Sequence, residues 1–256
     1  MEKSIYVIHE NDDWIIPLRE SFNKINAPFK EWHMDKESFD FKKAPPTGVF
    51  YNRMSASSHS RGHRYAPENT RDVLGWLEKD KRRVINNSKA LEIEISKVKQ
   101  YEELKKFKIN FPETYCAKDK KEILEISKKF NKPFITKHNR GGRGLGVKYF
   151  KNKLELEKYV NENFEDSIDG ITLLQEYINS DPKVITRVEF VKGKFLYAVQ
   201  VDASDGFELC PADECNAKEK FCPTNPDGNK FMILKDYKNP EIKKYEDLLK
   251  SNGIEI

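Results

Sequence analysis

The feature that most constrains this chain is a glycine- and arginine-rich loop between two short apolar segments. The first segment ends at Lys137, the loop covers residues 139–146, and the second segment, residues 147–150, follows at once. Glycines let backbone N–H groups approach an anion without interference from a Cβ atom, and arginines add fixed positive charge. The pattern predicts a β-hairpin that folds over phosphate groups. A flexible basic hairpin without a ligand is the alternative that the loop alone leaves open.

Two better-known glycine motifs do not describe this loop. The dinucleotide-binding fingerprint must open a helix, whereas here the chain returns to a strand-like segment. A P-loop requires Gly-Lys followed by Ser or Thr, and that sequence is missing from the loop. The anion-binding hairpin therefore stays the preferred interpretation.

Length and charge exclude several classes of protein. A chain of 256 residues suits two modest domains with a buried core. The 46 Lys and Arg residues nearly balance the 42 Asp and Glu residues, so the net charge of +4 indicates a solvated surface and not a nucleic-acid-binding protein. No signal-peptide core or membrane-length apolar run is found, so we expect no membrane partner. Four cysteines without an export signal predict reduced thiols and a cytoplasmic location.

Hydrophobic patterning predicts alternating strands and helices over residues 1–88, which is typical of a small parallel α/β lobe. The expected strands are 4–9, 28–33, 49–51 and 83–85, and the expected helices are 14–25 and 67–77. Beyond Ser88 one long helical stretch is expected through Leu104. Strands are then expected at 111–116, 133–137, 147–150, 171–178, 184–191 and 195–201. Further helices are expected at 120–130, at 154–164, and from Asn239 to a stop at Gly253.

Four segments in this order carry a resemblance to a known superfamily. They are "VINNSKALEIEISKVKQYEELKKFKINFPET", "FITKHNRGGRGLGV" and "LLQEYI", followed by "ITRVEFVKGKFLYAV". The chain resembles the ATP-grasp superfamily, most closely the RimK-type alpha-L-glutamate ligases and related carboxylate–amine ligases. The resemblance covers roughly residues 82–201. It implies an α/β fold with α+β nucleotide-binding lobes: a pre-ATP-grasp lobe (1–88), then an ATP-grasp domain (89–256) with a central lobe near 111–178 and a C-terminal lobe at 179–256.

The resemblance also assigns roles to individual residues. Lys97 and Lys137 would contact nucleotide phosphates as positive point charges, beneath a lid formed by Gly141, Gly142 and Gly144. The adenine site would be lined by Gln175, Glu176, Tyr177 and Ile178. Arg187 would stabilise charge on the γ-phosphoryl group during transfer. The family's acidic position near the ribose falls at Ile185 or Thr186 here, and Asp181 is the nearby substitute.

The loop from residue 52 to residue 67 is the next dense group of charges. It follows a predicted strand, and loops beyond strand C-termini are where open α/β sheets bind ligands. Guanidinium groups bind carboxylates and phosphates through two donors at once. Related ligases present the acyl substrate from this lobe, so the substrate-side candidates are Arg53, His59, Arg61, His63 and Arg64; a solvated loop is the alternative.

Three cysteines lie close together in the C-terminal third. Cys210, Cys215 and Cys222 lack the usual two-residue spacing of a zinc knuckle, so free thiols are favoured over a soft-metal site. Nearby Asp202, Asp205 and Glu208 are candidate polar contacts to substrate or nucleotide.

One part of the family pattern is missing. ATP-grasp ligases take their Mg²⁺ ligands from an acidic residue on a late strand and from a following Glu-x-Asn, and no Glu-x-Asn with the right context occurs near Ile256. The cofactors implied are ATP and Mg²⁺, with the metal ligands expected beyond Ile256. A truncated chain is favoured over a nucleotide-binding protein that lacks full catalysis.

The expected function is an ATP-dependent ligase that forms an amide or peptide bond through an acyl phosphate, with an amino acid such as glutamate as the amine. Its partners would be small-molecule or peptide carboxylates and amines, with no nucleic acid. A homo-oligomer is compatible with the resemblance, although no interface is readable. The alternatives are a catalytically silent ATP-binding module, an ATP-grasp kinase and, more weakly, nucleic-acid binding through the basic loops.

Overall fold

The computed structural model describes residues 4–142, 144, 146–204 and 231–256. The chain divides into two compact units. The first comprises Met1–Lys99, Phe190–Lys194 and Lys243–Ile256, and the second comprises Gln100–Glu189 and Phe195–Ile242. This grouping follows packing and not homology, so the domain boundaries given above stay predictions.

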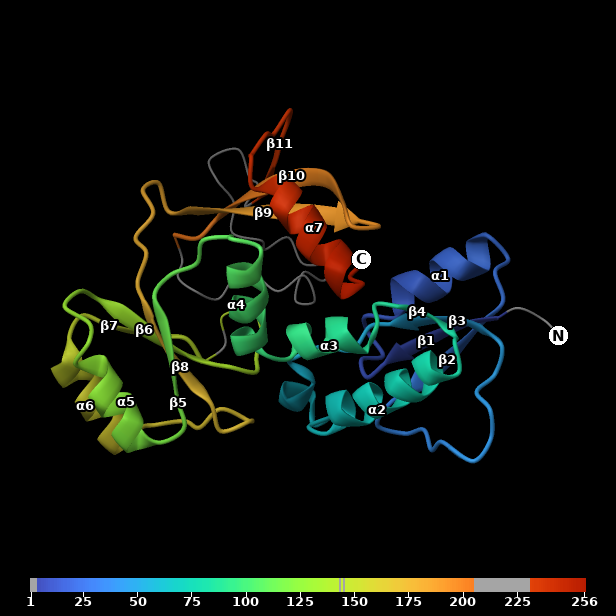
Figure 1. Ribbon diagram of the computed structural model, residues 1–256, viewed down its shortest axis with the longest axis horizontal. Coiled ribbons are helices and arrows are strands. Elements are labelled where there is room, and N and C mark those ends of the chain that lie inside the picture. Colours follow the sequence, from blue (N-terminus) through green and yellow to red (C-terminus); the bar gives the residue numbers. More distant parts are fainter. Residues whose placement is uncertain (1–3, 143, 145, 205–230) are drawn as a thin grey trace. The chain divides into compact units, whose positions relative to one another are not determined.

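The first unit contains a four-stranded parallel sheet with the order β2-β1-β3-β4. Its strands are β1 (Ser4–His9), β2 (Phe29–His33), β3 (Gly48–Asn52) and β4 (Arg83–Ile85). Helix α1 (Ile16–Lys24) covers one face and helix α2 (Ala66–Lys79) the other (Figure 1). The parallel α/β lobe predicted from the sequence is therefore confirmed in its architecture.

Alternation along the strands decides which face of this sheet meets α2. Tyr6, Ile8 and Phe50 pack against Val73 and Leu74 of α2 in one apolar cluster. Gly48 is required where β1 and β3 meet, because a Cβ atom there would lie 2.4 Å from the Ser4 carbonyl oxygen. Because successive side chains of a strand point to opposite faces, the odd-numbered positions of β1 face the α1 side.

Shorter elements complete the first unit. A 3-10 helix, η1 (Ser58–Arg61), follows β3, and α3 (Ser88–Glu94) is capped by the Asn87 side chain, which accepts from the Ala90 amide. Helix α7 (Ile242–Asn252) ends before Gly253, whose φ is +65°. Asn86 Oδ1 then accepts from the Glu255 amide at 2.8 Å, which joins the last residues to the end of β4.

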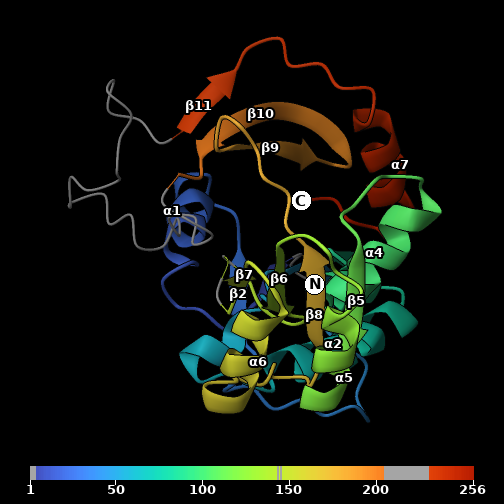
Figure 2. The same ribbon diagram turned by 90° about the vertical axis from the view of Figure 1, so that its left-hand side faces the viewer.

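The second unit has an antiparallel sheet with the order β5-β8-β6-β7. Its strands are β5 (Thr114–Ala117), β6 (Phe134–His138), β7 (Lys148–Phe150) and β8 (Thr172–Glu176). Helices α5 (Lys120–Ser127) and α6 (Lys153–Glu162) lie side by side against one face (Figure 2). Phe134 and Leu174 of the sheet pack there with Ile123 and Leu156 of the helices. The opposite face carries the polar residues discussed below.

Another sheet of the chain has three strands in the order β11-β10-β9. It is formed by β9 (Val184–Val191), β10 (Lys194–Asp202) and β11 (Phe231–Leu234). Helix α4 (Lys97–Lys106) precedes the second unit's first strand. No helix in the described ranges is long and apolar enough to cross a bilayer.

Two expected elements differ from the structure, and one strand was missed. The helical stretch from Ser88 is two helices, because α3 ends at Glu94 and the Ser96 hydroxyl accepts from the Lys99 amide in the first turn of α4. The strand expected from Phe111 begins only at Thr114, since Pro112 has no amide hydrogen to donate to a ladder. Strand β11 was not predicted at all.

The core of the second unit provides a stability prediction. Replacing the fully buried Leu174 with alanine should lower the free energy of unfolding by about 2–5 kcal/mol, because a cavity replaces packed side-chain atoms. Leu154 is 75% exposed on α6, so its replacement by alanine should change that free energy by less than about 0.5 kcal/mol. Urea denaturation monitored by circular dichroism measures both. Equal losses in the two variants would contradict the burial assigned to Leu174.

Candidate functional site

Lys137 lies on β6, on the sheet face opposite α5 and α6. Its Nζ donates to the Tyr101 hydroxyl at 2.6 Å and to Gln175 Oε1 at 2.8 Å. Gln175 Nε2 donates in turn to Tyr101 and to Thr114 Oγ1, at 2.8 and 2.6 Å. Alternation explains the placement, since Phe134 and Leu174 point into the helix-covered core while Lys137 and Gln175 point away from it. Three strands and α4 thus hold one ammonium group.

The electrostatics of this network favour an anion. Burial lowers the pKa of Lys137 to about 8. The acceptors that hold its ammonium are a phenol and an amide, which are neutral and leave the positive charge uncompensated. Incoming phosphate oxygens would supply the missing negative charge and restore the charged form of the amine.

The glycine loop between β6 and β7 is anchored at its first residue. Asn139, only 3% exposed, donates through Nδ2 to Asp169 Oδ2 at 2.6 Å, and its amide donates to the Ile171 carbonyl. Neither Gly141 nor Gly142 would bring a Cβ atom closer than 4.0 Å to another residue. These two glycines therefore leave room over the loop, as a lid over phosphates requires.

The end of the loop depends on a glycine that the sequence analysis did not single out. Gly144 and Gly146 have φ values of +81° and +72°. A Cβ atom on Gly146 would lie 3.0 Å from the His138 ring. The spacing of the glycines in the sequence could have pointed to Gly146. Its closeness to His138, however, depends on how the strands pair.

The four residues predicted to line an adenine site have different environments. Gln175 is buried in the Lys137 network, and the Glu176 carboxylate accepts from the Glu113 amide at 2.9 Å. The Tyr177 amide donates to the Pro133 carbonyl, and the Tyr177 ring packs edge-on against Tyr149. Ile178, which follows β8, is 59% exposed. The backbone amides of Glu176 and Tyr177 thus donate to carbonyl groups of the protein, and the adenine-binding role of the four residues stays a prediction.

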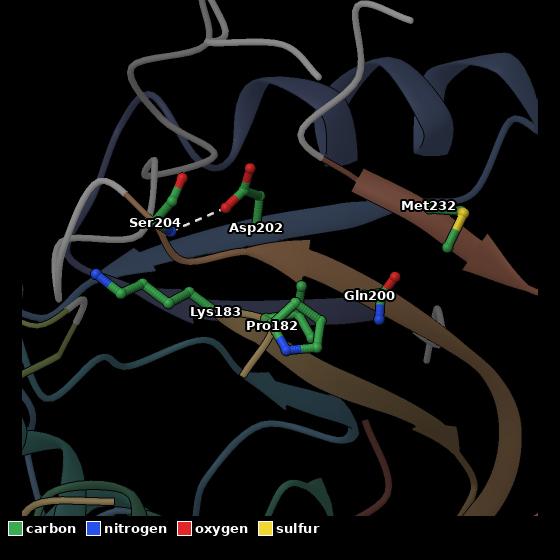
Figure 3. A pocket seen from close by; sticks show the side chains of 7 residues that line it. Pro182, Lys183, Gln200, Asp202, Ser204 and Met232 are labelled. Carbon is green, nitrogen blue, oxygen red and sulfur yellow. Dashed lines mark hydrogen bonds between the residues drawn. The ribbon is translucent and has the colours of Figure 1, made fainter. Parts of the chain in front are cut away.

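A pocket of about 320 Å³ opens beside the remaining predicted residues of the second unit (Figure 3). It is lined by Pro182, Lys183, Val184, Gln200, Asp202, Ser204 and Met232. The Ser204 amide donates to Asp202 Oδ1 at 2.8 Å, which orients that carboxylate. Asp181 immediately precedes the lining and is exposed, whereas Arg187 is an exposed residue of β9 outside it. Lys183 was not among the predicted residues.

The charged loop after β3 is partly committed to acidic partners within the first unit. Arg61 donates through Nε to Glu10 Oε2 at 3.1 Å, with Glu10 only 1% exposed. His63 Nδ1 lies 2.8 Å from Asp35 Oδ2. A guanidinium group paired with a buried carboxylate is expensive to remove from it. Arg61 is therefore a structural residue of this lobe, and Glu10 is its unpredicted partner.

The structure also places the other candidates of the first unit. Arg53 is exposed and lies 5.7 Å from the centre of the Tyr51 ring. Arg64 lies 5.2 Å from the centre of the Tyr65 ring, and His59 is a half-buried residue of η1. Lys97, the first residue of α4, belongs to the first unit and is half-buried. Their roles stay predictions.

Some predicted residues fall outside the described ranges. These are Cys210, Cys215 and Cys222 together with Asp205 and Glu208. Cys116 on β5 carries a free, exposed thiol.

Comparison with known proteins decides the fold. The ATP-grasp domain family matches residues 95–197, which include Lys137, the glycine loop and Arg187. The structure is similar to a RimK domain ATP-grasp protein from Sphaerobacter thermophilus (TM-score 0.57, 12% identity, 82% of this chain and 77% of that one). The chain has the ATP-grasp fold.

Two further ATP-grasp structures are similar over almost the whole chain. D-alanine–D-alanine ligase from Bacillus anthracis has a TM-score of 0.61 and 18% identity, covering 98% of this chain and 79% of the ligase. The ATP-grasp ligase PsnB, in complex with a minimal precursor, has a TM-score of 0.63 and 15% identity, with coverages of 99% and 84%. A search of curated proteins gives no match.

Mg²⁺ accompanies ADP in a PsnB structure, so the donor groups of this chain bear on whether the metal fits. Among the described residues, one group of three converging metal-ligating side chains is found, His9, Asp12 and His33. Mg²⁺ prefers six oxygen ligands, and two imidazoles do not supply them. These three residues therefore do not form a site suited to Mg²⁺.

The Lys137 network makes a direct spectroscopic prediction. In protein labelled with ¹³Cε-lysine, one lysine resonance should titrate with a midpoint near pH 8, because burial disfavours the charged amine. That resonance should disappear in Lys137→Gln, whereas in Lys148→Gln, on the neighbouring strand, it should remain. A spectrum in which every lysine titrates near pH 10.4, the ordinary value, would contradict the assignment.

Proposed function

We propose that this chain is an ATP-dependent ligase that joins a carboxylate to an amine through an acyl phosphate, with an amino acid such as glutamate as the candidate amine. The observation that carries the proposal is the Lys137 ammonium group, held by neutral partners beside a glycine loop. The ATP-grasp fold supports nucleotide as the anion in question.

Each part of the second unit then has a role in nucleotide binding. Lys137 would bind phosphate oxygens, and the loop containing Gly141, Gly142 and Gly144 would cover them with backbone N–H groups. The pocket beside Asp181 would receive the nucleoside part, with Asp202 and Lys183 as its charged groups. Arg187 would approach the phosphoryl group during its transfer.

The reaction follows from positioning and charge neutralisation. An oxygen of the substrate carboxylate attacks the γ-phosphorus, the bond to the β-phosphate oxygen breaks, and ADP leaves. The amine then attacks the acyl carbon, phosphate leaves, and the amine proton passes to solvent. No protein nucleophile is required, so the protein contributes orientation and positive charge. Precursor peptide is present in PsnB structures, which extends the proposed carboxylate class to peptides.

Nucleotide affinity should depend on pH through Lys137. The free amine has a pKa of about 8, and phosphate binding raises it, so binding above pH 8 takes up a proton. Affinity for ATP should be nearly constant below about pH 7 and fall by up to about tenfold per unit above pH 8. Calorimetry from pH 6.5 to 9.5 measures this trend.

Variants separate this effect from general changes in the protein. Lys137→Ala should weaken ATP binding at pH 7 by roughly 10- to 100-fold, because a charge-assisted hydrogen bond is lost. Lys137→Arg should keep most of the affinity and flatten the pH profile, since guanidinium stays charged. Lys148→Ala, an exposed lysine of β7, is the matched control. Unchanged affinity in Lys137→Ala would remove that lysine from the site.

The reaction itself is tested by product analysis. With Mg-ATP and candidate substrates, ADP should form only when a carboxylate and an amine are both present. Arg187→Ala should lower that rate by about 10²- to 10³-fold, because one charge-stabilising group is lost, while the exposed Arg71→Ala should not. ADP formed without an amine would indicate a kinase. Tight nucleotide binding without turnover would favour the silent binding module.

A further inference from the structure

Two buried histidines end neighbouring strands of the first unit. His9 is the last residue of β1 and His33 the last residue of β2, and the parallel register pairs these two positions directly. In-register residues of neighbouring strands point to the same face of a sheet, which brings the two rings to a centroid distance of 5.2 Å. His9 is 2% exposed and His33 is 7% exposed.

The two imidazoles have unsatisfied nitrogen atoms. Within the part of the chain that the structure describes, neither ring nitrogen of His9 makes a well-formed hydrogen bond, although Nε2 lies near the Glu31 carboxylate, and His33 Nδ1 has no partner. A buried polar atom without a partner is costly, so such atoms are rare in native proteins. A metal ion could bind one of these imidazole nitrogens, because it accepts the lone pair of a neutral imidazole.

A carboxylate completes the group. Asp12 follows β1 in a turn, and its Oδ2 lies 3.9 Å from His33 Nε2. One ligand atom from each of His9, Asp12 and His33 lies within 4.8 Å of the others. Two ligands bound at about 2 Å from one ion can be at most about 4 Å apart, so a small inward shift of the exposed Asp12 closes the site.

The surroundings of His9 resemble the outer partners of metal-binding histidines. His9 Nε2 lies 3.3 Å from Glu31 Oε2. Glu31 itself accepts two hydrogen bonds from Arg19, both at 2.7 Å. A carboxylate in this position fixes the orientation of a ligating imidazole.

Two cations now lie close to the Asp12 carboxylate, namely Lys36 and, at 3.8 Å from Oδ1, the guanidinium group of Arg19. Lys36 Nζ lies 3.0 Å from Asp12 Oδ2, and the two side chains are 60% and 57% exposed. Exposed pairs of this kind contribute little, and the long lysine side chain can turn into solvent. A dication would therefore compete with the Lys36 ammonium for Asp12.

We propose that His9, His33 and Asp12 bind a divalent first-row transition-metal ion, for which Zn²⁺ is the probe, with Glu31 orienting His9. Two imidazoles and a carboxylate form a nitrogen and oxygen donor set suited to such an ion. Three protein ligands leave a fourth tetrahedral position for water or an anionic group. The proposal is independent of nucleotide binding and of ligase activity.

The test is a calorimetric titration of the full chain with Zn²⁺ after removal of metal with a chelator. One ion per chain should bind, and Asp12→Asn and His33→Gln should each weaken that binding by at least about tenfold. Asp13→Asn, an exposed neighbour with the same charge change, should leave it unaltered. Lys36→Gln should tighten it several-fold, which a purely structural cluster would not do.

Spectroscopy and thermal melting show which side chains hold the ion and whether the variants fold. The Co²⁺ form should lack a thiolate charge-transfer band, and melting in chelator should show that Asp12→Asn and Lys36→Gln are folded like the wild type. A thiolate band would place the ion on cysteine and overturn the proposal. Absence of saturable binding at micromolar Zn²⁺, or binding that is the same in wild type, Asp12→Asn and Lys36→Gln, would overturn it as well.

Discussion

A lysine ammonium held by neutral groups links three strands and one helix in the second unit of this protein, which has the ATP-grasp fold. The amine of Lys137 joins Tyr101 from α4 and Gln175 from β8, and Gln175 extends the network to Thr114 on β5. A carboxylate in place of Gln175 would have neutralised the positive charge of Lys137 in an ion pair within the protein. Neutral acceptors position the amine and leave its charge for a ligand.

The glycine loop takes its geometry from the same sheet. Asn139 and His138 hold its two ends, the first through Asp169 and the second by its ring against Gly146. A loop anchored in this way begins beside the end of the strand that carries Lys137, so the groups proposed to contact phosphate start from one strand. Precise placement of this kind is what phosphoryl transfer requires, since orientation supplies much of its rate.

Much of this arrangement was predictable from the sequence, and the failures have physical causes. Residues 83–85 and 184–191 were predicted as strands with their exact bounds, because hydrophobic alternation and flanking turn residues are local signals. The contact between Lys137 and Tyr101 is not local, since it joins positions 36 residues apart through tertiary packing. The same holds for Arg61 and Glu10, which are 51 residues apart. Arg53, by contrast, is exposed, and among the described residues its side chain contacts Tyr51.

The register of β1 and β2 has a consequence for how folding of the first unit can be followed. His9 and His33 share a face only when the two strands pair as they do here. A slip by one residue would move one ring to the α2 side, because successive side chains alternate between faces. Any signal that requires both imidazoles together, such as a shared ligand, is therefore a reporter of native strand alignment and not merely of compaction.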